Sequence, residues 1–280
     1  MLETPFKIIE KSPCMKAQKQ TVHFTDKYLL SPQNPILINL IGAGGTGSQV
    51  LTGLARMNES LVALGHPGIF VRHFDADVVT VANLGRQLFA KSEIGLYKAS
   101  VLISRINRFF GTNWKAICEQ FCIATAPDLQ RSNITISCVD KASTRFEIAT
   151  ILKGQNISNI ADDRPIYWMD FGNGLNTGQV LLATVAEVRQ PESKKFKPCG
   201  HLPCVTDEFK TALANVEDKD LPSCSLAEAL HRQDLFINST LSSFGCSLLW
   251  SLFREGMITS RGLFLNLKEF RTQPIPVSKI

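Results

Sequence analysis

The sequence lacks the features of several common protein classes. No apolar run approaches the roughly 20 residues that span a bilayer, and the first residues lack the basic, apolar and small-residue order of a signal peptide. Internal repeats and low-complexity segments are also absent. The 30 lysines and arginines are scattered, so the net charge of +5 gives no basic patch for nucleic acid. We therefore expect a soluble cytoplasmic protein that binds neither membranes nor nucleic acid.

C-x-x-C pairs are absent as well, although the chain has eight cysteines. In a cytoplasmic protein, cysteines are expected as free thiols, metal ligands or nucleophiles rather than as disulfides. The 280 residues are 44% hydrophobic, which is enough apolar material for the buried core of one large domain.

Strand-like and helical segments alternate from residue 36 onward, a pattern typical of a parallel sheet covered by helices. Only residues 172–178 separate two later strand-like segments, so these two are expected to form an antiparallel hairpin. The predicted fold is α/β, a Rossmann-like three-layer αβα arrangement whose mixed sheet is parallel in its N-terminal half and largely antiparallel in its C-terminal half. We expect strands from residue 36 and at 68–74, 114–121, 133–138, 166–171, 179–188 and 263–267, helices at 46–57, 92–110, 142–153 and within 223–254, and an extended tail at 274–277.

A glycine cluster ends the first strand-like run, in I-L-I-N-L-I-G-A-G-G-T-G-S at residues 36–48. Gly42, Gly44 and Gly47 have the G-x-G-x-x-G spacing, and Gly45 lies between them. We expect Gly42 to permit the turn off the strand, Gly44 to let a phosphate approach the backbone, and Gly47 to let helix and strand pack closely. The N–H groups at the start of the next helix then face the ligand. The alternative is a glycine-rich turn without a ligand.

Two acidic residues, Asp75 and Asp77, directly follow the second expected strand. An ionised carboxylate at this place suits the hydroxyls of a ribose, because it accepts two hydrogen bonds. The alternative for both residues is a loop acid that caps a turn.

Charged and amide side chains follow in the next segments. Arg86, flanked by Asn83 and Gln87, carries a planar fork that matches phosphate oxygens. Lys98 lies early in an expected helix, where it can meet a phosphate, although a lone lysine at such a position is ordinarily solvated. Asp140 ends a strand in the run C-V-D, where an acid near phosphates is a natural Mg²⁺ ligand. Together these residues describe a nucleoside-triphosphate site rather than a hydride-transfer site.

Four motifs in this order resemble the signature of the ThiF/MoeB and ubiquitin-activating-enzyme superfamily. They are G-A-G-G-T-G-S at 42–48, D-A-D-V-V-T-V-A-N-L-G-R-Q at 75–87, I-G-L-Y-K-A at 94–99 and C-V-D at 138–140. The resemblance covers residues 36–190. The distal half, with P-S-C-S-L-A-E-A-L and Q-D-L-F-I-N, is similar to the ThiF-type proteins of the bacterial PRTRC gene cluster.

The resemblance implies a ubiquitin-like modifier activating enzyme, an adenylyltransferase. Such an enzyme binds MgATP and adenylates the C-terminal carboxylate of a small ubiquitin-like (β-grasp) protein, with release of pyrophosphate. A carboxylate that attacks an α-phosphate brings negative charges together, so the enzyme must supply opposing charge, and no general base is needed. By motif, the nucleotide-binding residues are Gly42, Gly44, Gly45, Gly47, Asp75, Asp77, Gln87 and Asp140, the residues at the phosphates and the reacting centre are Asn83, Arg86 and Lys98, and Asp140 holds Mg²⁺.

We expect one adenylation domain at residues 35–280, preceded by an N-terminal arm at 1–34. Its ATP-binding half spans 35–160, and its substrate-binding half spans 161–280 and contains a crossover loop at 189–222. Members of the superfamily commonly form homodimers in which an arginine from the partner's arm completes the ATP site. Nothing in residues 1–34 identifies that arginine.

Superfamily members often hold zinc with two C-x-x-C pairs, and this chain departs from that spacing. Cys199, His201, Cys204 and the distant Cys224 are the set that can make a tetrahedral Zn²⁺ site, and the alternative is a flexible polar loop with incidental thiols. Cys224 opens an expected helix, where the pKa of a thiol is lowered. Three roles stay open for it: a nucleophile that receives the activated protein, a zinc ligand, or an ordinary residue at a helix start.

Three other functions also stay open. They are an enzyme of the same fold that adenylates a peptide or a non-protein substrate, an NAD(P)-dependent oxidoreductase, and a non-catalytic scaffold of a plasmid-borne complex. The N-L-G-R-Q segment and the aspartate after C-V argue against an oxidoreductase, and the filled charged positions argue against a scaffold.

Overall fold

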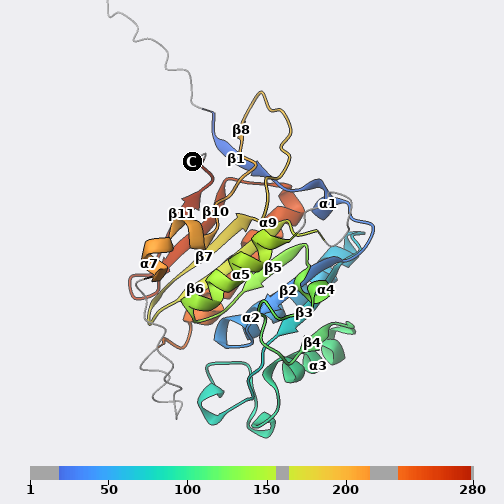
Figure 1. Ribbon diagram of the computed structural model, residues 1–280, viewed down its shortest axis with the longest axis vertical. Coiled ribbons are helices and arrows are strands. Elements are labelled where there is room, and N and C mark those ends of the chain that lie inside the picture. Colours follow the sequence, from blue (N-terminus) through green and yellow to red (C-terminus); the bar gives the residue numbers. More distant parts are fainter. Residues whose placement is uncertain (1–18, 156–163, 215–232, 279–280) are drawn as a thin grey trace, which may run out of the picture.

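The computed structural model describes residues 19–155, 164–214 and 233–278, and it shows one large sheet with helices on both faces (Figure 1). The strand order is β11-β10-β7-β6-β5-β2-β3-β4. The neighbours from β6 to β4 are parallel, and the pairs β6–β7, β7–β10 and β10–β11 are antiparallel. This confirms the predicted Rossmann-like fold with a mixed sheet. The strands are β2 (Ile36–Ile41), β3 (Ile69–Phe74), β4 (Lys115–Ile117), β5 (Ile134–Ser137), β6 (Tyr167–Asn173), β7 (Thr177–Thr184), β10 (Ser260–Asn266) and β11 (Arg271–Pro276).

Two cores lie on the two faces of this sheet. Side chains alternate along a strand, so each buried strand supplies both cores. Leu40 and Met169 pack into the core with α2 and α9, whereas Ile41 and Trp168 pack into the core with α5. Figure 1 shows α5 in front of the sheet and α9 behind it. The main helices are α2 (Gly45–Ala63), α3 (Lys98–Phe110), α5 (Ala142–Gly154) and α9 (Ile237–Glu255).

A second, three-stranded sheet joins the N-terminal segment to the domain. It contains β1 (Thr21–Phe24), β8 (Lys197–Pro198) and β9 (Met257–Ile258) in the order β8-β1-β9. The short helix α1 (Lys27–Leu30) follows β1. Part of the expected arm is therefore packed onto the domain, and residues 1–18 lie outside the described chain.

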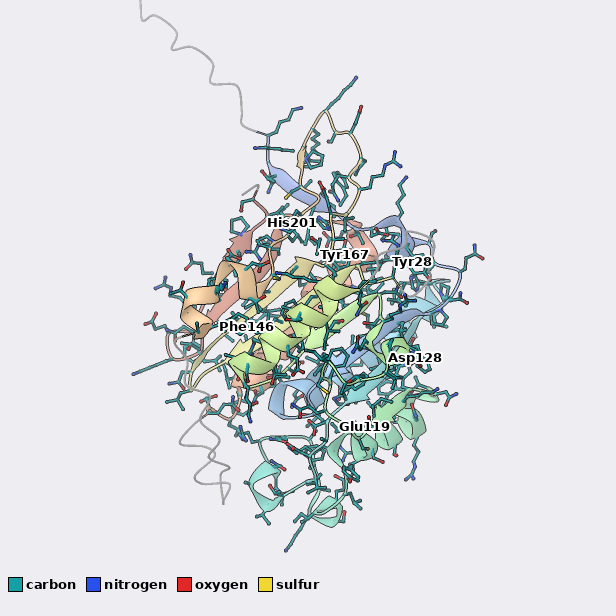
Figure 2. The ribbon with its side chains drawn as sticks, viewed as in Figure 1. Tyr28, Glu119, Asp128, Phe146, Tyr167 and His201 are labelled. Carbon is teal, nitrogen blue, oxygen red and sulfur yellow. The ribbon has the colours of Figure 1, made fainter. Side chains whose placement is uncertain are left out.

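A buried histidine and tyrosine fix this small sheet at the end of the molecule where Figure 2 labels Tyr167 and His201. His23 Nδ1 lies 2.7 Å from the carbonyl oxygen of Cys199, and its Nε2 lies 2.8 Å from the Tyr167 hydroxyl. Since only an N–H can donate to the carbonyl, Nδ1 carries the proton and Nε2 accepts from the tyrosine. The Tyr167 hydroxyl accepts in turn from the Asp26 N–H at 3.0 Å.

The helix predicted at 92–110 begins later than expected. Residues Lys91–Glu93 form a 3-10 turn (η2), and α3 starts only at Lys98. Gly95 has φ +87°, a left-handed conformation that a helix does not contain, and Val78 pairs with Tyr97 in an isolated bridge. The apolar residues between 94 and 97 are exposed, so they mimic a helical pattern without forming a buried face.

The extended tail predicted at 274–277 is largely a strand. β11 pairs with β10 along its length, for example Pro274 with Leu263. The two prolines of β11 fit an edge strand, which has one side free of ladder hydrogen bonds. The strand predicted at 114–121 is too long, because only Lys115–Ile117 pair with β3.

Several short elements complete the described chain. They are the 3-10 turn η1 (Val81–Asn83), α4 (Pro127–Gln130), α6 (Val205–Glu208) and α7 (Lys210–Ala214). The last two occupy part of the expected crossover loop, and residues 215–222 of that loop lie outside the described residues, as does the start of the helical region predicted from 223. No helix of the described chain is long and apolar enough to cross a bilayer.

Candidate nucleotide-binding site

The order in which the chain adds strands to the sheet reverses at β2. From β2 the chain moves outward to β3 and β4 on one side, and to β5 and β6 on the other. In sheets of this kind, ligands bind where the carboxyl ends of two such diverging strands meet. Here those ends are the glycine turn after β2 and the residues after β5.

The glycine turn is built as the spacing requires. Gly42 has φ +94°, and a Cβ at this position would lie 2.6 Å from the carbonyl oxygen of Cys138. A Cβ on Gly47 would overlap the carbonyl oxygen of Gly42. The start of α2 therefore lies directly against the turn, and β5 lies against it from the other side.

The open side of this turn is at Gly44. Gly44 is the N-cap of α2, where no side chain caps the helix, and a Cβ built on it meets nothing within 4 Å. α2 is 19 residues long, so its first N–H groups and its dipole favour an anion at this end. The turn is thus shaped to accept a phosphate.

Asp75 at the end of β3 holds the turn from the side. Its Oδ2 accepts from the Ala43 N–H at 2.6 Å, and its Oδ1 accepts from the Asp77 N–H at 2.9 Å. Burial raises the pKa of the Asp75 carboxyl, while these N–H donors and the charge of Lys98 act in the opposite direction. The carboxylate predicted for a ribose is in place next to the turn.

Lys98 and Asp77 form an ion pair beside Asp75. Lys98 Nζ lies 2.8 Å from Asp77 Oδ2, and the Lys98 N–H donates to the Asp77 carbonyl at 2.9 Å. The lysine side chain is 9% exposed and the aspartate side chain 72% exposed. The aspartate thus holds the lysine from the solvent side, a contact that the motif alone does not indicate.

Arg86 and Gln87 carry buried polar atoms without partners. Arg86 Nη1 donates to Gln233 Oε1. Its Nε, and Oε1 of Gln87, have no hydrogen-bond partner among the described residues. Such atoms are costly unless a ligand or water satisfies them. Asn83 differs, because its Oδ1 accepts from the Thr80 N–H at 2.8 Å and caps the η1 turn.

A network of amide side chains, which the sequence did not reveal, joins these groups to the start of α2. Asn238 Oδ1 accepts from Thr46 Oγ1 at 2.8 Å and from Asn173 Nδ2 at 2.5 Å. Asn238 Nδ2 donates to Gln233 Oε1 at 3.0 Å, the oxygen that also accepts from Arg86. This network also requires a glycine at position 45, because a Cβ on Gly45 would overlap the Asn238 amide. The only sequence signal was an asparagine at a strand end and another at a helix start.

Asp140 lies two residues beyond Cys138, whose carbonyl touches the glycine turn, and it is exposed. Two of the three charged groups predicted to meet one nucleotide are linked by chains of hydrogen bonds to the turn after β2, and the third follows the neighbouring strand β5. Lys98 reaches it through Asp77 and Asp75, Arg86 reaches it through the amide network, and Asp140 follows the neighbouring strand.

The residues proposed for zinc do not form a cluster in the described chain. Cys199 Sγ donates to the carbonyl oxygen of His201 at 3.0 Å, and Cys204 Sγ lies 3.1 Å from Asp207 Oδ2. No group of three His, Cys, Asp or Glu side chains suits a metal among the described residues. Cys224 lies outside those residues. Burial raises the pKa of the Cys204 thiol, which makes it a poor nucleophile.

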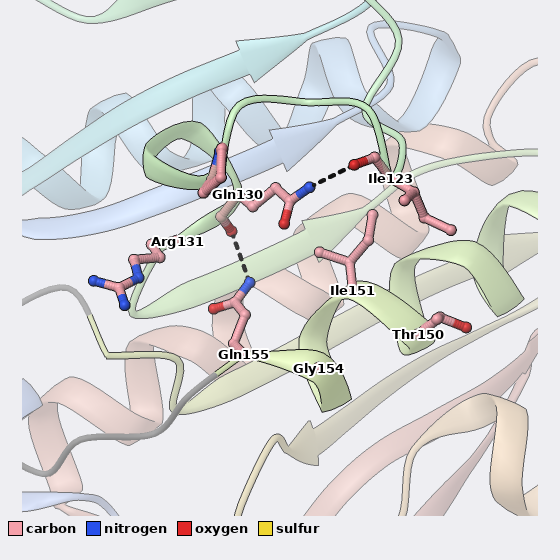
Figure 3. A pocket seen from close by; sticks show the side chains of 8 residues that line it. Ile123, Gln130, Arg131, Thr150, Ile151, Gly154 and Gln155 are labelled. Carbon is pink, nitrogen blue, oxygen red and sulfur yellow. Dashed lines mark hydrogen bonds between the residues drawn. The ribbon is translucent and has the colours of Figure 1, made fainter.

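A separate hollow of about 330 Å³ lies between α4 and the C-terminal end of α5 (Figure 3). Gln155 Nε2 donates to the Gln130 carbonyl at 3.1 Å, and Gln130 Nε2 donates to the Ile123 carbonyl at 3.1 Å. None of the predicted site residues lines it. The chemistry predicted from the sequence is therefore at the glycine turn and not in this hollow.

A comparison with protein families gives a match over the segment that contains the glycine turn. Residues 35–162 match the ThiF family, and this match contains every motif residue from Gly42 to Asp140. This part of the chain is therefore similar to the ThiF family. The family comprises E1-like adenylating enzymes that use ATP. The match is to ThiF as a whole and does not support the narrower PRTRC group.

Solved structures show the same fold at low identity. The crystal structure of PaaA has a TM-score of 0.55 at 15% identity over 89% of this chain, and E. coli MccB with AMPCPP and MccA has a TM-score of 0.54 at 12% identity over 88% of this chain. MccB with MccA-N7isoASN has 0.50 at 14% over 88%. The chain spans 65% of the length of each of these structures. A search of curated protein sequences gives no match.

Proposed function

We propose that this protein is a MgATP-dependent adenylating enzyme that acts on the C-terminal carboxylate of a polypeptide. A carboxylate oxygen bonds to the α-phosphorus, the bond from that phosphorus to the bridging oxygen breaks, and the electron pair leaves with pyrophosphate. The carboxylate is already ionised at neutral pH, so the protein has only to align the reactants and offset their negative charges.

The observation that carries the proposal is the open Gly44 end of α2 together with the polar groups that hydrogen bonds link to this turn. The helix start favours phosphate, and Asp75 supplies a carboxylate for the ribose. The unpartnered Arg86 Nε is a buried donor suited to a phosphate oxygen. Lys98 adds a second cation, because its partner Asp77 is largely exposed and can be displaced by a triphosphate.

The donor set also fits Mg²⁺. This ion commonly uses one or two carboxylates together with substrate phosphates and water, and Asp140 is an exposed carboxylate beside the turn. When bound, Mg²⁺ would neutralise phosphate charge at that point. Zn²⁺ has no comparable support from the described residues, and a zinc or nucleophile role for Cys224 stays a proposal of the sequence.

The acceptor we propose is a small β-grasp protein, as the motif order indicates. The second candidate is a short peptide, supported by the likeness in fold to E. coli MccB solved with AMPCPP and MccA. We further propose a cytoplasmic homodimer in which residues 1–34 contribute to the partner's site. The NAD(P) and scaffold alternatives receive no support from the site, since the unpartnered Nε of Arg86 and the charge of Lys98 suit a triphosphate.

The test is carboxylate-dependent exchange of pyrophosphate into ATP, with candidate β-grasp proteins and peptides as acceptors. Lys98→Ala should lower the exchange rate by about 100-fold or more while the protein stays folded, since the charge it supplies acts in the transition state. Lys91→Ala, an exposed lysine on η2, is the matched control and should leave exchange unchanged.

Mass spectrometry of the acceptor then identifies the product. An added AMP on the C-terminal residue of a β-grasp protein supports the first candidate, and the same adduct only on peptides supports the second. Full exchange activity in Lys98→Ala, or ATP binding without exchange for every acceptor class, would contradict the proposed reaction.

A further inference from the structure

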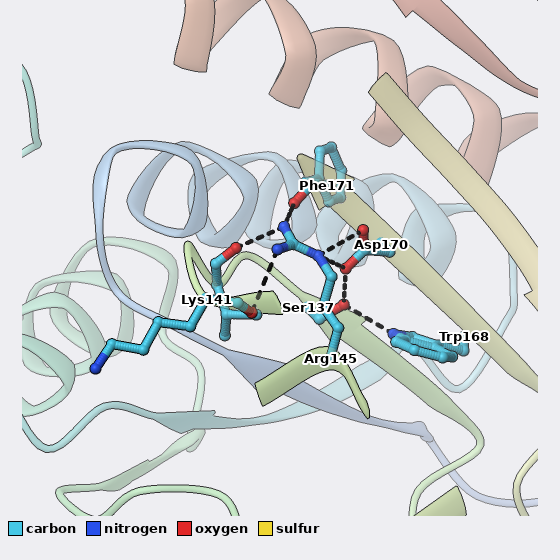
Figure 4. Close-up of polar contacts among 7 residues, drawn as sticks. Ser137, Lys141, Arg145, Trp168, Asp170 and Phe171 are labelled. Carbon is cyan, nitrogen blue, oxygen red and sulfur yellow. Dashed lines mark hydrogen bonds and ion pairs between the residues drawn. The ribbon is translucent and has the colours of Figure 1, made fainter. Parts of the chain in front are cut away.

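The guanidinium of Arg145 on α5 is buried, and each of its three nitrogens donates to at least one acceptor. Its Nε lies 3.0 Å from both carboxylate oxygens of Asp170 on β6 (Figure 4). Its Nη2 donates to the carbonyl oxygens of Val139 at 2.6 Å and Phe171 at 2.9 Å. Its Nη1 donates to the carbonyl oxygen of Lys141 at 3.4 Å.

Two of these acceptors lie on either side of Asp140. Val139 precedes it and Lys141 follows it, so the two ends of one rigid guanidinium fork hold the main chain before and after this residue. The Asp140 side chain itself faces solvent. The guanidinium therefore fixes the main-chain position of Asp140 without contacting its carboxylate.

Hydrogen bonds from buried side chains fix the position of Asp170. Ser137 Oγ donates to Asp170 Oδ1 at 2.5 Å, and Trp168 Nε1 donates to Ser137 Oγ at 2.8 Å. All four side chains are buried, and Figure 4 shows them as one connected set. The orientation of Arg145 is therefore set by β5, which pairs with β2, and by the next strand, β6.

We propose that Arg145 is a positioning residue for the Mg²⁺-binding aspartate of this site. Through its fork and Asp170 it holds the Asp140 loop in the one conformation that offers the carboxylate to a metal on ATP phosphates. The proposal rests on the proposed function, because it takes Asp140 as the metal-binding residue.

Stability alone does not explain such a pair. A buried ion pair is often no more stabilising than apolar side chains of similar size, since both charges lose their hydration. A guanidinium that donates to the carbonyl groups before and after a single exposed aspartate fixes the position of that residue, which apolar packing does not do. Partners of this kind behind metal ligands typically change metal affinity by about 10- to 100-fold when they are removed.

The test measures the affinity of the full chain for ATP by calorimetry, with Mg²⁺ and with EDTA. The quantity compared is the ratio of the two dissociation constants. Arg145→Lys keeps the charge opposite Asp170 but loses the fork, and the double variant Arg145→Met/Asp170→Val replaces the pair by apolar side chains. We expect the Mg²⁺ effect to fall by about 10-fold or more in both, with unchanged ATP affinity in EDTA and a retained thermal transition.

Two further variants separate the possible results. Arg105→Lys breaks the forked pair with Glu93 on the surface and should leave the Mg²⁺ effect unchanged. Asp140→Ala should abolish the Mg²⁺ effect. A full Mg²⁺ effect in folded Arg145→Lys overturns the positioning role while leaving the proposed function intact. A full Mg²⁺ effect in Asp140→Ala, or no ATP binding by the unaltered protein, contradicts the proposed function itself. Equal loss of affinity with and without Mg²⁺ in Arg145→Lys would mean a structural role only.

Discussion

A side chain at Gly47 would run into the carbonyl oxygen of Gly42, five residues earlier in the same turn. This closeness brings the start of α2 onto the end of β2 and leaves the Gly44 side open. The turn is therefore sensitive to volume on its inner side and tolerant on its outer side.

Gly47→Ala should destabilise the protein even though alanine is the better helix former. The exchange of glycine for alanine inside a helix ordinarily gains about 1 kcal/mol. Here the new methyl group meets backbone atoms, and overpacking of this kind costs about 1–3 kcal/mol or more. We expect a net loss of about 2 kcal/mol in urea unfolding. Gly154→Ala, where the added methyl meets nothing within 4 Å at the end of α5, is the control and should be neutral or slightly stabilising.

His73 should make the protein sensitive to mild acid. Its Nε2 donates to the Gly42 carbonyl, with 3.1 Å between the atoms, its Nδ1 is buried without a partner among the described residues, and burial lowers its pKa to about 4. The unfolded chain, with an ordinary histidine pKa near 6.5, binds the proton first as the pH falls. The stabilisation is therefore complete above about pH 6.5 and is lost between pH 6.5 and 4, by up to about 3 kcal/mol.

The measurement is the free energy of unfolding from pH 8 to pH 4. His73→Gln keeps a donor for the Gly42 carbonyl and does not titrate, so its curve should be flatter than that of the parent protein. His23, whose pKa burial also lowers, adds a slope of the same sign that remains in the variant. Identical slopes for the two proteins would show that His73 does not control this acid sensitivity.

The sequence predicted the parts of this molecule whose determinants are local. β2, the glycine turn and α2 follow one another along the chain, and their apolar and glycine pattern suffices to predict them. The predicted start of α3 was wrong, because residues 94–97 have an apolar pattern that looks helical. The pairing of Val78 with Tyr97 and the left-handed conformation of Gly95 prevent a helix there. The strand β11 was missed because its partner β10, and not its own proline-rich sequence, makes it a strand.

The site divides in the same way. Asp75, Lys98 and Asp140 could be proposed individually because each follows a strand or opens a helix, and Arg86 because it lies in the N-L-G-R-Q segment. Their supports could not be, because they come from distant segments: Asn238 bonds to Thr46 across 192 residues, and Asp170 bonds to Arg145 from the neighbouring strand. A pattern in one sequence does not indicate such pairs until the fold brings them together.

Gly45 and Asn238 should be energetically coupled. Gly45→Ala pushes against the Asn238 amide, which bonds to Thr46, Asn173 and Gln233, so the single variant should lose about 1–2 kcal/mol. In Asn238→Ala/Gly45→Ala the obstructing amide is gone, and the second change should cost almost nothing more. A double-mutant cycle in urea should therefore give an interaction energy of about 1 kcal/mol. Strict additivity would show that the glycine is not required by the asparagine.

Gln233→Glu should weaken ATP binding by holding Arg86. The oxygen that accepts from Arg86 Nη1 and from Asn238 Nδ2 would be kept, but it would now carry negative charge. A charge-assisted hydrogen bond is worth about 1–2 kcal/mol more than a neutral one, so the new carboxylate would compete with the phosphate for the Arg86 guanidinium. This carboxylate would also repel the phosphate. We expect the KM for ATP to rise by about 10- to 30-fold. Gln233→Leu, which removes the acceptor without adding charge, should change KM only two- to threefold. If the two variants raised KM equally, the charge would not be the cause, and Arg86 would not be the group that meets the phosphates.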